Sequence, residues 1–384
     1  MIYLDNAATS FPKAPGVAEG VAWQINNVAG NPGRASYKSS LKIDSVICDV
    51  REKIVELLKL EDSSQVIITH NATHALNMVI LGSIKPNETI LISPLEHNSV
   101  MRPLSFLQQN RNIKLEYYKL GKDFTPDFED LTEKLRSGSI DKVITTVCSN
   151  VTGTILPLQE ISKICKANKI PLIVDASQLV GYEELDFSTI SVSAICFPGH
   201  KGLLAPSGTG ILWLAKDFEI DPLYFGGTGS RSGSILQPDF TPDKYESGTV
   251  NISGIYGLNI ALDYLMKESV KKVRSTKNEI VEYLLTKMNE LEEIIIYSNQ
   301  DLARQIGVIS FNCVGTTCSD VARFLDKQDI AVRMGLHCSP QAHQFINTLK
   351  LGGTVRLSPS YFTTKTEIDI TINKLKEMIY GLNN

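Results

Sequence analysis

The stretch that most constrains this chain runs from Ala194 to Leu212. It opens with AICF, a short apolar run typical of a buried strand. Pro198-Gly199 ends that run, His200-Lys201 follows, and a second apolar run begins at Gly210. A lysine between two buried strands is costly as an ammonium, because burial disfavours the charged form. Such a lysine is tolerated when its amine has a chemical role, most commonly Schiff-base formation; a surface lysine at a hairpin turn is the alternative.

A carboxylate upstream favours the chemical role. The run PLIVD has the pattern of another buried strand and ends at Asp175. A strand-end aspartate followed by a strand-end lysine is the pair that pyridoxal phosphate enzymes need. The lysine holds the aldehyde, and the aspartate keeps the pyridine nitrogen protonated. The sequence therefore predicts pyridoxal 5'-phosphate as cofactor, with Lys201 and Asp175 as its anchors.

The motifs around these two residues point to a known family. IVDASQ (173–178) followed by CFPGHKG (196–202) resembles the class V aminotransferase fold, in particular its cysteine desulfurase branch. The resemblance runs from YLDNAAT at Tyr3 to RLSPSYF at Arg356. It implies an α/β, fold-type I architecture: a large domain (15–255) with a mostly parallel seven-stranded sheet, and a smaller α+β domain (256–384 plus 1–14).

Composition narrows the class of protein. The chain has 384 residues, 43% of them hydrophobic, and a net charge of -4, which argues against a nucleic-acid partner. No apolar run approaches the length of a membrane span, and MIYLDNAATSFPK has neither the basic nor the apolar region of a signal peptide. Seven cysteines without CxxC spacing argue against disulfides and a metal site. We therefore expect a cytoplasmic enzyme without a metal.

Several polar residues follow predicted strands, where the resemblance places the cofactor. Thr73 and the N–H of His74 open a helix after the strand 66–69 and match the family's phosphate-binding turn; an ordinary helix cap is the alternative. His97 matches the histidine that stacks on the ring. Asn150 and Gln178 match residues near the phenolic oxygen, Asn150 also near the substrate carboxylate; a turn asparagine is its alternative.

The family also implies a shared active site. Gly248-Thr249 resembles the loop that reaches the neighbouring subunit's phosphate site, which implies a homodimer. Pro198 stands where many relatives have a serine that donates to the phosphate. We expect Thr73, His200 and Thr249 of the partner to replace that contact.

A second reactive residue lies in RMGLHCS. Cys338 follows His337 in a polar loop after a strand, and exposure with nearby positive charge favours its thiolate. A structural cysteine is the ordinary alternative. The resemblance makes Cys338 the sulfur acceptor, in the short loop of the group II (SufS-like) branch. It makes Arg356 the clamp of the substrate carboxylate and places Ala8 beside that carboxylate.

Apolar periodicity predicts the remaining elements. We expect helices over 40–60, 158–168 and 365–382, and a loop over 31–34. One long helix (255–291) would lead to the small domain, where 330–333 would form a strand.

The function implied is desulfuration of L-cysteine to L-alanine, with Lys201, His97 and Cys338 as catalytic residues. A sulfur-accepting protein would then collect the persulfide sulfur for iron–sulfur cluster assembly, thiolation or selenium metabolism. Alternatives are a selenocysteine lyase or another β-eliminating lyase or aminotransferase of this fold, and a non-catalytic scaffold that binds the cofactor.

Overall fold

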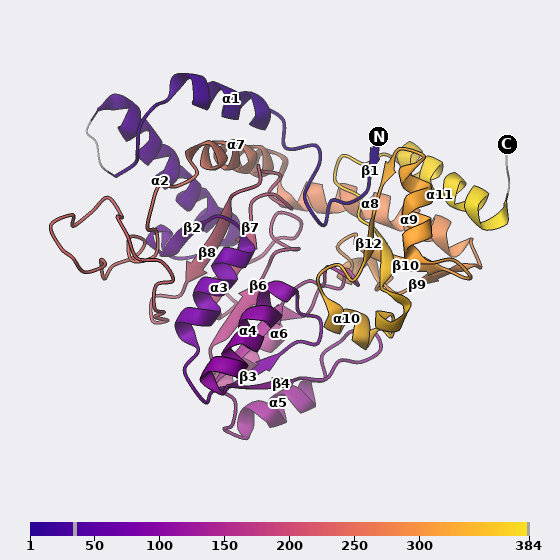
Figure 1. Ribbon diagram of the computed structural model, residues 1–384, viewed down its shortest axis with the longest axis horizontal. Coiled ribbons are helices and arrows are strands. Elements are labelled where there is room, and N and C mark those ends of the chain that lie inside the picture. The colour runs from indigo at the N-terminus through magenta and orange to yellow at the C-terminus, as the bar shows by residue number, and fades with distance from the viewer. Residues whose placement is uncertain (34–36, 382–384) are drawn as a thin grey trace.

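A computed structural model describes residues 1–33 and 37–381 of the chain (Figure 1). Two predictions reach beyond these ranges: Arg34 ends the predicted loop 31–34 and Leu382 ends the predicted closing helix, and both lie outside the described residues. The helices of eight or more residues are α1 (Val17–Asn27), α2 (Lys38–Leu58), α3 (Ala72–Ser83), α4 (Asn98–Arg111), α5 (Phe128–Arg136), α6 (Leu158–Ala167), α7 (Ile252–Glu268), α8 (Val270–Asn289), α9 (Cys318–Asp326) and α11 (Lys365–Tyr380).

The large sheet has seven strands in the order β2-β8-β7-β6-β5-β3-β4. Only β8 runs antiparallel to its neighbours; the other neighbouring pairs are parallel, which confirms the predicted sheet. The strands are β2 (Val66–Thr69), β3 (Thr89–Ile92), β4 (Lys114–Tyr117), β5 (Lys142–Thr146), β6 (Leu172–Asp175), β7 (Ala194–Pro198) and β8 (Gly210–Leu214).

Helices cover both faces of this sheet because successive strand residues point to opposite sides. In β6, Leu172 and Val174 belong to one buried cluster and Ile173 to the other. Residues of α2, α6 and α7 complete the first cluster, and residues of α3 and α4 complete the second. Burial on both faces explains why β3, β6 and β7 are near-continuous apolar runs, whereas the edge strand β4 carries a lysine and a glutamate.

A smaller sheet lies in the C-terminal part of the chain. It has the antiparallel order β12-β13-β10-β9, with β9 (Ile294–Ile296), β10 (Ile309–Cys313), β12 (Arg333–Gly335) and β13 (Thr354–Leu357). The N-terminal strand β1 (Ile2–Tyr3) pairs in parallel with β11 (Ile330–Ala331). The first residues of the chain therefore join the C-terminal part, as Figure 1 shows.

The predicted single helix over 255–291 is wrong. The chain forms α7 and α8 instead, interrupted at Ser269, which has a left-handed φ of 66°. The Ser269 hydroxyl accepts a hydrogen bond from the Lys272 N–H and so caps α8. A serine that caps the following helix competes with helix continuation, which explains the break.

The predicted strand over 330–333 is also wrong as one element. Its first half, β11, pairs with β1, and its second half begins β12, which pairs with β13. The chain changes sheets at Val332, and periodicity alone cannot reveal such a change because both halves are extended.

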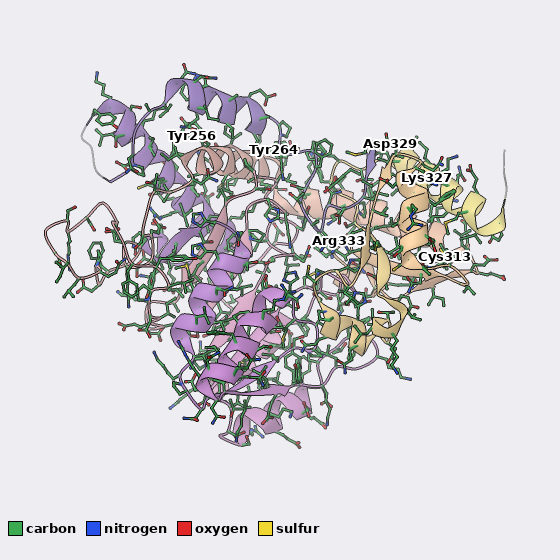
Figure 2. All side chains as sticks on the ribbon, viewed as in Figure 1. Tyr256, Tyr264, Cys313, Lys327, Asp329 and Arg333 are labelled. Atoms are coloured by element: carbon green, nitrogen blue, oxygen red, sulfur yellow. The ribbon has the colours of Figure 1, made fainter. Side chains whose placement is uncertain are left out.

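The first buried cluster of the large part includes residues of α7, whereas most apolar residues of α8 pack in the C-terminal cluster. Tyr256 and Tyr264 on α7 lie over the large part, and Cys313 lies in the C-terminal part (Figure 2). The expected boundary at 255/256 falls inside α7. We propose that the two domains meet near Ser269, with residues 1–14 in the smaller one.

Within residues 1–33 and 37–381, no helix combines the length and the apolar character that crossing a membrane requires.

Candidate active site

A cavity of about 210 Å³ lies at the carboxyl ends of β5, β6 and β7, where open α/β sheets commonly bind ligands. The large part supplies most of its walls, and the C-terminal part closes one side. Ten of the predicted site residues line it: Ala8, Thr73, His97, Asn150, Asp175, Gln178, His200, Lys201, Cys338 and Arg356. Residues separated by more than 300 positions in the sequence therefore meet in one space.

Three predicted residues lie elsewhere. The His74 N–H donates to the cap residue Asn71 (2.8 Å), and the His74 ring stacks on His70 with centroids 5.1 Å apart. Burial, with the charge of His70, lowers the pKa of His74 to about 4. Gly248 and Thr249 line a separate hollow beside Gly33. Within this one chain, these residues do not contact the Lys201 cavity.

The cavity changes the ionisation of its two central groups. Burial lowers the pKa of the Lys201 amine to about 8; Asp175 opposes this shift and two arginines reinforce it. Burial raises the pKa of the Asp175 carboxyl, while hydrogen bonds from Ser177 and the charge of Lys201 oppose that shift. The Ser177 N–H lies 2.9 Å from Asp175 Oδ1. A substantial fraction of Lys201 is thus the free amine near neutral pH, as a nucleophile requires.

One wall of the cavity is the first turn of α3. Thr73 Oγ1 contacts Ser99 Oγ at 2.7 Å, and the Ser99 N–H donates to Nδ1 of His97 at 3.0 Å. Burial, reinforced by the charges of Lys201 and nearby arginines, lowers the pKa of His97 to about 3. The imidazole is therefore neutral, and because Nδ1 accepts, its proton resides on Nε2.

His200 and the N-terminal segment form the opposite wall. Nδ1 of His200 is buried and has no hydrogen-bond partner in the part of the chain that the structure describes. The Ser10 N–H donates to the His200 carbonyl (2.9 Å), and Gln178 Nε2 donates to the Ala7 carbonyl (3.0 Å). A buried polar atom without a hydrogen-bond partner costs free energy. An anionic ligand in the cavity could supply the partner that Nδ1 of His200 lacks.

Arg356 is held at the far end of the cavity by groups from two regions. Its Nη2 forms a salt bridge with Asp5 (2.6 Å), and its Nη1 donates to the backbone carbonyl of Asn150 (3.1 Å). The side chain is only 1% exposed. Fixed in this way, Arg356 presents positive charge to the cavity in one orientation.

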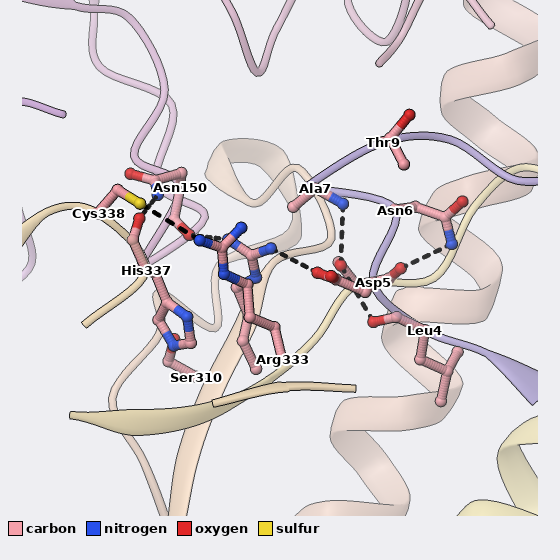
Figure 3. A network of polar contacts seen from close by, with 12 residues as sticks. Leu4, Asp5, Asn6, Ala7, Thr9, Asn150, Ser310, Arg333, His337 and Cys338 are labelled. Carbon is pink, nitrogen blue, oxygen red and sulfur yellow. Dashed lines mark hydrogen bonds and ion pairs between the residues drawn. The ribbon is translucent and has the colours of Figure 1, made fainter. Parts of the chain in front are cut away.

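Cys338 reaches the same cavity from the C-terminal part. Its side chain is exposed, and Arg333 Nη2 donates to its sulfur at 3.3 Å (Figure 3). His337 is not the source of the expected positive charge: burial and nearby charges lower its pKa to about 2, so its imidazole is neutral. The positive charge beside the sulfur comes from Arg333.

The sequence of this chain resembles those of known proteins over nearly its whole length. The family described as Aminotransferase class-V matches residues 2–371. A protein of Methanothermobacter thermautotrophicus named probable cysteine desulfurase is 30% identical, over 98% of this chain and 94% of that one. The chain belongs to the cysteine desulfurases of the class-V aminotransferase family. A probable cysteine desulfurase of Pyrococcus abyssi is 29% identical over 100% of this chain and 96% of its own.

The fold of this desulfurase is shared with solved structures. The apo structure of a cysteine desulfurase from Thermococcus onnurineus superposes with a TM-score of 0.92 at 27% identity, covering 99% of this chain and 95% of that one. The predicted fold-type I architecture and the enzyme class are thereby confirmed. The family is pyridoxal phosphate-dependent; the roles of individual residues in this desulfurase stay predictions.

Sequence reasoning missed three residues at this site. Arg333 and Ser99 line the cavity, and the fully buried Glu96 accepts the Thr146 N–H (2.6 Å). Burial and the charge of Asp175 raise the pKa of Glu96 well above its usual value, which favours the neutral form of this carboxyl. Sequence position offered a signal for Glu96 and Arg333. Glu96 directly precedes His97, and Arg333 begins β12, the strand before the Cys338 loop.

Proposed function

We propose that this desulfurase converts L-cysteine to L-alanine with pyridoxal 5'-phosphate and receives the sulfur on Cys338 as a persulfide. The observation that carries the proposal is that Cys338 and Lys201 open into one cavity, together with Asp175 and Arg356. An amine and a thiol facing one substrate volume can act on two different atoms of the same small amino acid.

The residues present fit this cofactor. Lys201 would bind its aldehyde and Asp175 its pyridine nitrogen. Thr73, at the first turn of α3, and the unpartnered His200 would meet the phosphate, because a helix N-terminus favours an anion. His97 would stack on the ring. Once held there, the cofactor supplies the electron sink that makes bond cleavage at the substrate Cα and Cβ accessible.

The side chains of the cavity then handle the proton and the charge. The Lys201 amine, with its pKa lowered to about 8, takes the proton from the substrate Cα. Arg356 attracts the substrate carboxylate, and Ala8 leaves room beside it. Arg356 already contacts Asp5 and Asn150, so its orientation is set before the substrate arrives, which lowers the entropic cost of alignment.

Cys338 handles the sulfur. Its thiolate, placed beside the Arg333 guanidinium, attacks the substrate sulfur. The S–S bond forms as the C–S bond breaks, and the electron pair of the broken bond stays with the carbon skeleton. That skeleton takes up a proton at Cβ, regains a proton at Cα from Lys201, and leaves as L-alanine. A protein thiol must then accept the terminal sulfur, which makes a sulfur-acceptor protein the expected partner.

Completion of the phosphate site requires a second copy of the chain. Gly248 and Thr249 lie outside the Lys201 cavity of their own chain. The preceding loop carries side chains with high exposure, namely Phe225 (74%), Ile235 (100%) and Leu236 (76%). A loop of this composition is typical of a buried interface, so a homodimer would bring Gly248-Thr249 to the partner's cofactor.

The deciding experiment incubates the purified holoenzyme with L-cysteine, with and without reductant. The expected products are alanine in both cases, sulfide with reductant, and a persulfide on Cys338 without it. Absence of alanine under reducing conditions would contradict the proposal. Comparison of kcat/KM for L-cysteine and L-selenocysteine separates the desulfurase from a selenocysteine lyase.

A further inference from the structure

The loop that carries Cys338 has an unusual backbone. Gly335, His337 and Cys338 all have left-handed φ values, of 97°, 49° and 60°. Residues other than glycine adopt this conformation at an energetic cost and keep it only where surrounding contacts impose it. The reactive sulfur therefore occupies a position that its own loop does not favour, and contacts from elsewhere must hold it.

Those contacts converge on one side chain of the large part. Asn150 Nδ2 donates to the His337 carbonyl at 2.7 Å, and the Ser339 hydroxyl donates to Asn150 Oδ1 at 2.7 Å. The carboxamide thus bridges the residues immediately before and after Cys338. Ser339 is fully buried and Asn150 is 8% exposed, so water does not readily replace either bond. Figure 3 shows Asn150 directly against the His337–Cys338 backbone.

Asn150 is itself rigidly placed. It lies in the turn after β5, where the Ser149 hydroxyl accepts from the N–H groups of Val151 and Thr152. Its carbonyl accepts from Arg356. One residue therefore links the Cys338 loop to the sheet that carries Lys201 and to the arginine at the substrate end.

We propose that Asn150 is a positioning residue for Cys338: its carboxamide clamps the left-handed loop and sets the sulfur over the Lys201 cavity. This inference rests on the proposed function and changes the predicted role of Asn150, which was contact with the cofactor. An amide suits the clamp because it donates to one partner and accepts from the other, whereas an aspartate places a carboxylate against the His337 carbonyl.

Ser339→Ala tests the clamp without altering a residue that lines the cavity. We expect persulfide formation on Cys338, measured in a single turnover with L-cysteine, to slow about tenfold, because one buried hydrogen bond is lost and the nucleophile is misplaced. The absorbance change of the holoenzyme on mixing with L-cysteine should remain, since substrate binding does not use Ser339. Ser339→Thr, which keeps the hydroxyl, should recover most of the rate.

Ser310→Ala is the matched control. The fully buried Ser310 hydroxyl donates to the Val151 carbonyl at 2.7 Å, so it joins the C-terminal part to the same turn through a hydrogen bond that does not involve the Cys338 loop. Its persulfide rate should match that of wild type. A wild-type rate in Ser339→Ala, or equal slowing in both variants, would overturn the clamp. If Ser339→Ala does not fold, Asn150→Asp replaces it, and a wild-type rate there overturns the clamp equally.

A second measurement separates the clamp from the proposed function. Iodoacetamide alkylation of Cys338 is compared with that of Cys48, the other exposed cysteine, within the same protein. Ser339→Ala should change this ratio several-fold, because the contact of Cys338 with Arg333 depends on the loop. If the ratio in Ser339→Ala equals that of wild type, the clamp is refuted. If the ratio changes but the wild-type protein forms no persulfide with L-cysteine, only the desulfurase mechanism is refuted.

Discussion

Lys201 and Cys338 are the residues whose chemistry is easiest to separate. The amine has a pKa of about 8 instead of 10.5 because it is buried. Attachment of pyridoxal phosphate to cofactor-free protein should therefore accelerate with pH and level off above about pH 8. Absorbance measures the rate, and borohydride reduction followed by mass spectrometry locates the adduct. Labelling of another lysine, or a rate that still climbs toward pH 10.5, would contradict this assignment.

Cys338→Ala should leave attachment of the cofactor and the absorbance change with L-cysteine intact. Sulfide release should fall by a factor on the order of 100 or more, because the nucleophile for sulfur is gone. Cys48→Ala is the matched control, since Cys48 is also exposed but lies on α2 and should be dispensable. Near-normal sulfide release from Cys338→Ala would instead indicate a β-eliminating lyase.

At the scale of elements, α8 carries a buried amine that the proposed mechanism does not use. Lys277 is 3% exposed and its Nζ lies 3.7 Å from the centroid of the Tyr182 ring. Burial, with the charge of Arg274, lowers the pKa of Lys277 to about 7. In the unfolded chain the pKa of Lys277 is near 10.5, so between about pH 7 and 10.5 the unfolded state binds more protons than the folded state. Lys277 therefore makes the free energy of unfolding rise with pH over this range.

Lys277→Met should therefore stabilise the fold, most strongly below pH 7, where the folded protein must bury an ammonium. The gain should shrink as pH rises from 7 toward 10.5, because the folded amine is then already neutral. Denaturant unfolding at pH 6.5 and 9 measures the difference. A gain that is equal at both pH values, or larger at pH 9, would show that burial of the charge does not limit stability.

For the whole molecule, the proposed homodimer would complete the site. Replacing both Ile235 and Leu236 with aspartate should yield monomers, because charges would be buried at the interface. Cofactor affinity should fall by about tenfold or more, as expected when charge-assisted phosphate contacts from the partner are lost. Sedimentation and cofactor titration measure both effects. Ile370→Asp is the control, because Ile370 is an exposed apolar residue on α11, away from this loop in the sequence. An active monomer with normal cofactor affinity would contradict the shared site.

The sequence by itself determined the sheet and the positions of Asp175 and Lys201 at the ends of its strands. The strands of the large sheet are local runs of apolar residues, and the strands bearing Asp175 and leading to Lys201 were recognisable because burial on both faces leaves such runs uninterrupted. The order of the motifs along the chain was enough to identify the family, as the match over residues 2–371 confirms. These features depend on neighbours along the chain, which a sequence displays directly.

Only the tertiary structure decided which residues meet and what they do to one another. Asn150 and Ser339 are 189 positions apart, and nothing local to either indicates that one holds the other. Arg333, not the adjacent His337, supplies the positive charge at Cys338, because burial keeps the histidine neutral. Burial and long-range contacts set these ionisation states and hydrogen bonds, and both exist only once the two parts of the chain pack together.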